Sequence, residues 1–343
     1  MSLNKKINAV FEGGGIRGIG HVGAACVFEQ KGYEFINLAG SSAGAIVASL
    51  LAAGYQCEEI KKEMSTLNYL KFKQESFLTR FGTVGKVISV LQNYGMYSSD
   101  YFEKWLNDLL RKKNKVFFGD IKNYRYPCGN VPYTLQITAS DLTDKRLLIL
   151  PNDLPDFCID PDTFSIAKAV RMSMNIPIFY KPYKLRDCNG KEHYIVDGGL
   201  LSNYPIWLFD HVQSNCQCST VGFKFVNQNK NVEERKMNQT NMNIVDYVMS
   251  LVATALNAKD KQYISSSKGD FQRTVTIPTD ITINRKTKNI SATDFGISKE
   301  ESEALFYNGV KAANQFLNIW NYDQWKRSYQ KPIQQGNLIY MKK

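Results

Sequence analysis

The sequence predicts an α/β fold built on a mainly parallel β-sheet. An apolar run at 7–11 leads into a glycine-rich turn and a helical pattern, and a second apolar run at 35–39 leads into a tight turn and a helix of small residues. Further short apolar segments alternate with helical ones along the chain. This order is typical of parallel sheets, because parallel neighbours need a long crossover connection, which is usually a helix.

The first two helices have recognisable ends. The first is expected over 19–31, with Gly32 placed to end it. The second opens at Ser42, continues through small residues to Ala53 and closes at Gly54. The segment 58–118 then mixes Lys, aromatic and aliphatic residues at helical spacing, which predicts amphipathic helices and is interpreted as a helical cap.

In the remainder of the chain, segments with the apolar pattern of strands again alternate with segments that have the pattern of helices. Strands are expected at 131–139, 146–150, 194–196 and 220–226, and helices at 164–174 and 244–266. Ser298 and Glu301 form a capping box for a last helix that ends near Trp320. No repeat or linker divides the chain, so we expect a single domain over 1–343 with a basic tail at 320–343.

Composition is that of a folded globular protein, with 43% apolar and 22% charged residues in 343. Apolar runs such as 43–53 fall short of the roughly 18 residues that a bilayer span needs. The start of the sequence lacks a signal-peptide pattern, so a cytoplasmic location is expected, without excluding specialised export. The seven cysteines include no pair or Cys/His cluster at metal-ligand spacing, which predicts reduced thiols and no metal site.

The net charge of +11 indicates attraction to an anionic partner, either a lipid surface or nucleic acid. A solvated surface that keeps the protein soluble is the alternative interpretation. The basic residues are spread along the chain without a compact block or an aromatic-interleaved stripe. Nucleic acid is therefore not expected as a partner, whereas peripheral contact with a membrane is.

The pentapeptide Gly40-Ser41-Ser42-Ala43-Gly44 fits the pattern G-x-S-x-G. In a nucleophile elbow the serine sits on a strained strand-to-helix turn, so its flanking positions Gly40 and Gly44 must be small. The expected strand before it and helix after it strengthen this interpretation. Ser42 would then lie at a helix N-terminus, which stabilises negative charge. A serine that only caps the helix is the alternative.

The residues Gly13, Gly14, Gly15, Ile16, Arg17 and Gly18 form a glycine-rich turn between a strand and a helix. The spacing also fits the dinucleotide-binding pattern, which needs an acidic residue about 20 positions further on to hold a ribose. The second strand ends in Leu38-Ala39-Gly40-Ser41 without a carboxylate, so no nucleotide cofactor is expected. Consecutive glycines can instead aim several backbone N–H groups at one oxyanion.

A serine nucleophile needs a base. His21, His193 and His211 are the three histidines, and none of them stands in a recognisable triad context. Asp197 ends an apolar strand before Gly198 and Gly199, where a carboxylate would enter a tight, partly dry turn and gain basicity. An Asp that merely caps a turn has the same local pattern, and spacing alone favours that interpretation.

The G-G-G-x-R-G turn, the G-x-S-x-G elbow and the distant D-G-G together resemble the patatin-like phospholipase family. Weaker echoes lie at 138–142, 173–177 and 294–295. The resemblance implies a three-layer α/β/α fold, no metal or cofactor, and hydrolysis of phospholipid or other acyl-lipid esters. It further implies that Ser42 is the nucleophile and Asp197 the base. The backbone of Gly14, Gly15 and Ile16 would form the oxyanion hole, and Arg17 matches the family's arginine in that turn.

One departure from the family is Met174-Asn175, where many members have small alanines. It puts the shape of the acyl pocket in question more than the chemistry. Two other functions stay open at this point. An acyltransferase would use the same two residues in a pocket that excludes water, and a non-enzymatic nucleotide- or membrane-binding module would use neither.

Overall fold

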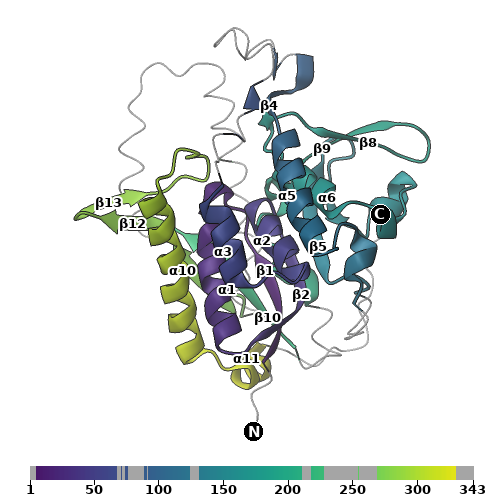
Figure 1. The fold of residues 1–343 in the computed structure, drawn as a ribbon. Coiled ribbons are helices and arrows are strands. Elements are labelled where there is room, and N and C mark those ends of the chain that lie inside the picture. Colours follow the sequence, from purple (N-terminus) through teal and green to yellow (C-terminus); the bar gives the residue numbers. More distant parts are fainter. Residues whose placement is uncertain are drawn as a thin grey trace.

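A large mixed β-sheet forms the centre of the molecule (Figure 1). The computed structural model describes residues 5–67, 71, 74–75, 89–90, 92–123, 131–210, 218–227, 254 and 269–329. The strands of the sheet follow the order β11-β10-β1-β2-β5-β9-β8, and β6 pairs with β5. Their bounds are β1 (Lys6–Phe11), β2 (Glu34–Gly40), β5 (Leu135–Asp141), β6 (Arg146–Leu150), β8 (Tyr183–Arg186), β9 (Glu192–Asp197), β10 (Ser219–Val226) and β11 (Thr274–Pro278).

The five strands from β11 to β5 are parallel, whereas β6, β8 and β9 join by antiparallel pairing. The predicted α/β class with a mainly parallel sheet is therefore confirmed. The antiparallel strands reverse the chain direction next to β5. The strands β2 and β9 approach from opposite directions, and their pairing with β5 brings the end of β9 level with the end of β2, which matters for the site described below.

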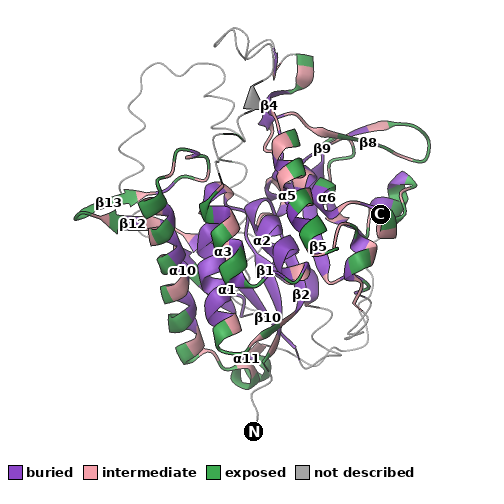
Figure 2. Ribbon diagram, in the orientation of Figure 1, coloured by how far each residue is buried: buried purple, intermediate pink, exposed green. Residues whose placement is uncertain are grey.

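Helices cover both faces of the sheet, which gives three layers. The longer helices are α1 (Gly18–Gln30), α2 (Ala43–Ala52), α3 (Cys57–Ser65), α5 (Asp100–Lys112), α6 (Ile166–Met174), α10 (Lys299–Ile319) and α11 (Tyr322–Tyr329). α10, α1, α3 and α2 lie side by side over one face, and their inner sides are buried (Figure 2). The short helix α7 (Gly199–Ser202) and the 3-10 helix Ile206–Phe209 follow β9 on the other side.

Alternation along the strands separates the two cores. Ala9 and Leu38 belong to the large cluster under α1 and α2, whereas their neighbours Val10 and Ala39 pack with Ile206 and other residues of a second cluster. Successive side chains of a strand point to opposite faces, so the two clusters lie on opposite sides of the sheet. The three-layer α/β/α architecture follows from this.

The segment 58–118 does not form the all-helical cap that the sequence predicts. Between α3 and α5 the chain contributes β4 (Gly95–Ser98), which pairs with β3 (Gln74–Glu75) and with β7 (Ile178–Tyr180). In the described parts of the segment, the apolar residues of α5 are buried in the main core: Phe102, Leu106, Leu109 and Leu110. These side chains stabilise the fold and cannot also enter a bilayer.

The C-terminal region confirms one prediction and revises another. The capping box of Ser298 and Glu301 opens α10, with both of its hydrogen bonds present. Residues 322–329 form α11 rather than a tail, because Trp325 is buried and donates to the carbonyl of Gly269. The predicted helix at 244–266 lies outside the described residues except for Thr254. The hairpin β12 (Asp280–Ile283) and β13 (Lys286–Asn289) was not predicted.

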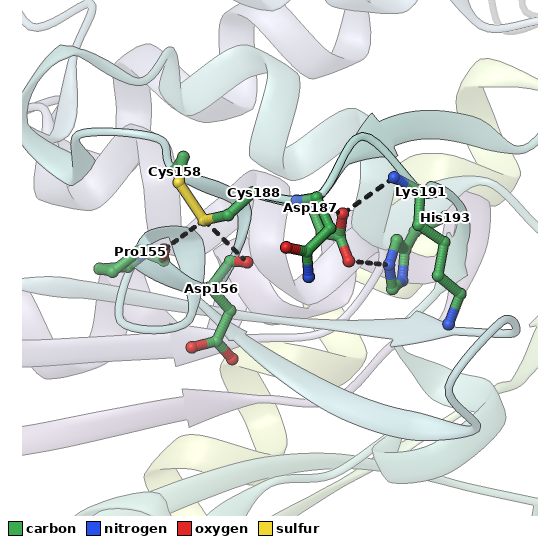
Figure 3. Close-up of a disulfide and its surroundings, with 8 residues drawn as sticks. Pro155, Asp156, Cys158, Asp187, Cys188, Lys191 and His193 are labelled. Carbon is green, nitrogen blue, oxygen red and sulfur yellow. Dashed lines mark hydrogen bonds and ion pairs between the residues drawn. A yellow bond between two sulfur atoms is a disulfide. The ribbon is translucent and has the colours of Figure 1, made fainter.

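The prediction of reduced cysteines is wrong at four positions. Cys26 pairs with Cys57. Cys158 pairs with Cys188, as Figure 3 shows. The partners are 31 and 30 residues apart in sequence, and only the packing of α1 on α3 and of the β8–β9 turn on the 154–157 segment brings them together. Cys218 is buried and free. Disulfides persist mainly in oxidising compartments, which disagrees with the cytoplasmic expectation.

No helix in the described part of the chain is long and apolar enough to cross a membrane. The longest of them, α10, is an amphipathic helix that packs along α1.

Candidate active site

Ser42 occupies a strained turn between β2 and α2. Its backbone has φ +50° and ψ −123°, a conformation that residues with a side chain rarely adopt. The turn is so tight that a Cβ on Gly40 would lie 2.4 Å from the Gly44 carbonyl carbon, and one on Gly44 would lie 2.2 Å from the Phe11 oxygen. The spacing G-x-S-x-G is therefore a packing requirement here, as expected of a nucleophile elbow.

The register of the sheet brings Asp197 to Ser42. Gly40 at the end of β2 pairs with Ile137 of β5, and Asp197 at the end of β9 pairs with Ala139, two residues further along β5. Ser42 stands two residues beyond Gly40, so both functional residues reach the same level of the sheet. The Ser42 side chain is hydrogen-bonded to the Asp197 carboxylate.

Asp197 has the electrostatic environment of a base. Its side chain is 2% exposed, and burial raises the pKa of the carboxyl to about 7, although hydrogen bonds from Ser42 and from the Gly199 N–H work in the opposite direction. Among the described residues, no basic side chain forms an ion pair with it. A carboxylate with a pKa near neutrality can both accept and return a proton, as a general base must.

The glycine-rich turn has two backbone donors to spare. The N–H groups of Ile16 and Gly13 donate to the carbonyls of Ala292 and Asn203 at 3.1 and 3.0 Å. Those of Arg17 and Gly18 bond within the turn itself. Within the described residues the N–H groups of Gly14 and Gly15 have no acceptor, and neither has that of Ala43, the first residue of α2. The predicted oxyanion role of Ile16 is thus not supported by its hydrogen bonding, and the sequence reasoning had not considered Ala43.

Side chains fix the shape of this turn beside Ser42. An added Cβ on Gly13 would lie 3.2 Å from the Cβ of Ser42, so the turn and the elbow are in contact. Arg17 donates from Nε to the Gly14 carbonyl at 3.1 Å, and its guanidinium stacks over Phe225. Gly15 has φ +57°, and a Cβ there would meet the Ala292 oxygen at 2.0 Å, so only glycine fits.

Asn203 links this turn to the loop after Asp197. Its carbonyl accepts from the Gly13 N–H, and its Nδ2 donates to the Gly13 carbonyl at 3.3 Å. The residue stands six positions after Asp197, just beyond α7. No local sequence signal marked it, because its importance arises from contact with a turn 190 residues away.

Two histidines of the sequence are committed to other contacts. Burial lowers the pKa of His21 to about 3, so the ring is neutral and its Nε2–H donates to the Glu12 carbonyl at 2.9 Å. Nδ1 of His193 bonds to the buried Asp141 carboxylate at 2.8 Å. The other ring nitrogen, Nε2, lies 3.7 Å from the Asp187 carboxylate, and Figure 3 shows the ring directed at this residue. His193 lies within β9. His211 lies outside the described residues.

Two groups of potential metal ligands come together in the described part of the chain, namely Cys26 with Cys57 and Glu58, and Asp141 with Asp144 and His193. The first is consumed by a disulfide. In the second, Lys191 already bonds to Asp144 at 2.6 Å and Arg146 lies 3.9 Å from Asp141. Basic side chains thus supply the positive charge that a metal would bring, and neither group suits one.

The structure defines the contacts of Asn175, one of the two residues that depart from the family pattern. Asn175 is fully buried, and its side chain bonds to Ser99 and to the Lys181 carbonyl. A cavity of about 520 Å³ lies apart from the Ser42–Asp197 pair, between α5 and α6. Its lining includes Arg171, which also bonds to Ser99.

The chain is similar to several known proteins. The family model described as "Patatin-like phospholipase" matches residues 9–210. The uncharacterized protein YqhO of Bacillus subtilis is 34% identical over 317 residues, which cover 92% of this chain and 99% of that protein. A protein of Invertebrate iridescent virus 6 named "Probable lipid hydrolase 463L" is 26% identical over 199 residues, 57% of this chain and 61% of that one.

Among solved structures, VipD from Legionella pneumophila has a similar fold, with a TM-score of 0.50 at 16% identity, covering 91% of this chain and 66% of that one. The matched family model spans the glycine-rich turn, the elbow and Asp197, which are the three elements that converge in the structure. The chain belongs to the patatin-like phospholipase family.

Proposed function

We propose that this protein is a lipid acyl hydrolase that works through a Ser42 acyl-enzyme with Asp197 as its only base. The observation that carries the proposal is the Ser42 hydroxyl bonded to a buried carboxylate whose pKa is raised to about 7. In a triad a histidine would stand between the two. Here the carboxylate contacts the serine directly, so it must handle the proton itself.

In the first step, Oγ of Ser42 attacks the carbonyl carbon of the ester while Asp197 takes the hydroxyl proton. A bond forms between Oγ and carbon, and the carbonyl electrons move to oxygen. The tetrahedral intermediate then collapses, the bond to the alcohol oxygen breaks, and Asp197 returns the proton to that leaving alcohol. The products are the acyl-enzyme and a lysolipid or other alcohol.

The second step repeats the first with water as the nucleophile. Asp197 takes a proton from water as it attacks the acyl carbon, and it gives the proton back to Oγ as Ser42 leaves. A base near pKa 7 suits both directions, because its proton affinity is close to the working pH. The free fatty acid is the second product.

The spare N–H groups of Gly14, Gly15 and Ala43 are our candidates for the oxyanion hole. Each lacks a partner among the described residues, and the glycine-rich turn lies so near Ser42 that a Cβ added to Gly13 would be 3.2 Å from the Ser42 Cβ. Ala43 also opens α2, so the positive end of the helix dipole adds to the field at this point. Removing one oxyanion donor in other enzymes costs about 10² to 10³ in kcat.

A phospholipid is our proposed substrate class, which follows the description of the family model and agrees with the printed name of the iridescent-virus relative. Such a substrate lies in a membrane, and the net charge of +11 favours an anionic surface. The disulfides between described cysteines favour a site of action that is oxidising rather than cytosolic.

The test is hydrolysis of a diacyl phospholipid in vesicles, followed as fatty acid release. Ser42→Ala should lower the rate at least about 10³-fold, since it removes the attacking atom. Ser41→Ala is the matched control, because the neighbouring Ser41 is also buried but its hydroxyl has no partner among the described residues. It should keep activity within about tenfold of wild type. Equal activity of wild type and Ser42→Ala would refute the proposal.

A further inference from the structure

We propose that Ser173, near the end of α6, is a positioning residue that sets the geometry between Ser42 and Asp197. The inference rests on the proposed function, and it assigns a role to a side chain that does not itself touch the reacting atoms. Ser173 is fully buried. It lies 131 residues from Ser42 in sequence and 24 from Asp197, so only the fold brings the three together.

Ser173 holds both halves of the catalytic pair at once. Its Oγ accepts from the backbone N–H of Ser42 at 2.8 Å. Its carbonyl accepts from the N–H of Gly198, the residue after Asp197, at 3.1 Å. One residue of α6 therefore fixes the elbow through its side chain and the Asp197 loop through its backbone.

The bond to the Ser42 N–H has a particular value at this turn. Ser42 is held at φ +50°, a conformation that persists only where the surroundings enforce it. The N–H is buried with its residue, and a buried donor without a partner destabilises the conformation that buries it. Without the Ser173 oxygen, the strained conformation of Ser42 is destabilised, and we expect its relaxation to move Oγ away from Asp197.

Asn175 anchors the same end of α6 to the rest of the molecule. Its carbonyl accepts from the Asp197 N–H at 2.9 Å. Its Oδ1 accepts from Oγ of Ser99 at 2.7 Å, and its Nδ2 donates to the Lys181 carbonyl at 3.0 Å. Ser99 in turn accepts from Nε of Arg171 at 2.9 Å, so each polar atom of this set has a defined partner.

The hydrogen bonds that run from Asn175 through Ser99 to Arg171 continue in ion pairs between Arg171 and α5. Nη1 of Arg171 lies 2.7 Å from Glu103 and 2.6 Å from Asp100. The helix α5 and the turn before β8 are thus tied to the segment that carries Ser173 and Asn175. This bracing makes α6 a rigid bridge between the nucleophile and its base, which is what a reaction sensitive to shifts of about 1 Å requires.

The decisive variant is Ser173→Ala, which removes the acceptor for the Ser42 N–H and leaves the backbone bond to Gly198 in place. We expect kcat to fall by about 10- to 100-fold, with KM changed less than about threefold, because substrate contacts are untouched. A second readout is the pH profile of kcat/KM. Since the bond from Ser42 lowers the pKa of Asp197, loosening it should move the acid limb to higher pH.

Three further variants separate positioning from stability. Ser49→Ala removes an equally buried hydroxyl, bonded to the Ile46 carbonyl at 2.8 Å on the same helix that Ser42 opens. It should lower Tm about as much as Ser173→Ala without changing the kinetics. Ser173→Thr keeps the oxygen and should recover most of the lost kcat. Asn175→Ala should lower kcat as well, because it frees the segment from Ser99 and Lys181.

The rate of covalent labelling of Ser42 by a fluorophosphonate completes the test, because it reports activation of the serine without any lipid. Slower labelling of Ser173→Ala, with normal labelling of Ser49→Ala, supports the inference. If Ser173→Ala labels and turns over like Ser49→Ala, the positioning role is refuted while the proposed function stands. If wild-type protein neither labels at Ser42 nor hydrolyses esters, both are refuted.

Discussion

Two buried carboxylates on neighbouring strands meet very different partners. Asp197 ends β9 and Asp141 ends β5, and the register sets them only two pairs apart, with Ala139 facing Asp197 and Asp141 facing Ile195. Both side chains are almost completely buried. Asp197 bonds to a serine hydroxyl and one backbone N–H. Asp141 bonds to His193 and to the N–H groups of Thr143 and Asp144, with Arg146 nearby.

The difference shows that burial alone does not decide which groups a carboxylate contacts. Asp141 and His193 reproduce the aspartate–histidine half of a triad, yet His193 has the acidic residues Asp144 and Asp187 around it rather than a serine. Asp197 has the serine and no histidine. The carboxylate of Asp141 is bonded to a histidine within a network of polar and charged groups, which suits a structural role. The carboxylate of Asp197 has no basic partner among the described residues, and its proton affinity is therefore available for a reaction.

The largest expected effect separates the two carboxylates by turnover. Asp197→Asn should lower kcat/KM for ester hydrolysis at least about 10³-fold, because the amide cannot take the Ser42 proton. Asp141→Asn should lower it less than about tenfold and should instead lower Tm, since a buried bond to His193 is weakened. Parallel kinetics and thermal melts of the two variants check this, and similar losses of turnover would break the distinction.

Whereas Asp141→Asn should lower the stability of the protein, Asp197→Asn should raise it at neutral pH. Its folded-state pKa of about 7 lies above the unfolded value near 3.8, so folding takes up a proton between these values and stability falls as pH rises through that window. A neutral Asn removes this cost. Asp197→Asn should therefore gain stability relative to wild type as pH rises from 4 to 8, by up to about 4 kcal/mol.

Urea unfolding of wild type and Asp197→Asn at pH 4, 6 and 8 measures this gain. Asp141→Asn is the matched comparison and should be less stable than wild type at neutral pH. A stability difference between Asp197→Asn and wild type that stays constant with pH would show that Asp197 is an ordinary ionised carboxylate.

The smallest expected effect concerns His193. His193→Asn should leave kcat/KM within about tenfold of wild type, because the ring bonds to Asp141 and packs edge-on against Phe157 rather than against Ser42. It should lower the free energy of unfolding by roughly 1–3 kcal/mol through loss of the buried bond. A well-folded His193→Asn protein that has lost activity more than about 10³-fold would reinstate a histidine-dependent mechanism.

Local patterns predicted the parts of the fold that depend on short-range physics. The strand–turn–helix units around Gly14 and Ser42, the glycine that ends α1 and the capping box of α10 are all determined by a few consecutive residues. The choice of Asp197 over a turn-capping Asp did not come from spacing. It came from the combination of three motifs, which the register of β2, β5 and β9 explains.

Features that depend on distant contacts were missed. The disulfide partners stand about 30 residues apart without a local pattern. The N–H of Ile16 donates to the carbonyl of Ala292, which is far away in the sequence. The sequence considered Asn175 only for its effect on the acyl pocket, and its bond to Ser99, 76 residues away, has no local sequence signal.

The most direct test of the central claim is the pH dependence of Ser42 labelling by a fluorophosphonate in wild type, Asp197→Asn and His193→Asn. The account predicts that labelling of wild type and of His193→Asn rises through about pH 7 as Asp197 loses its proton, and that Asp197→Asn labels very slowly at every pH. Labelling of Asp197→Asn at the wild-type rate with the wild-type pH dependence would show that another group activates Ser42.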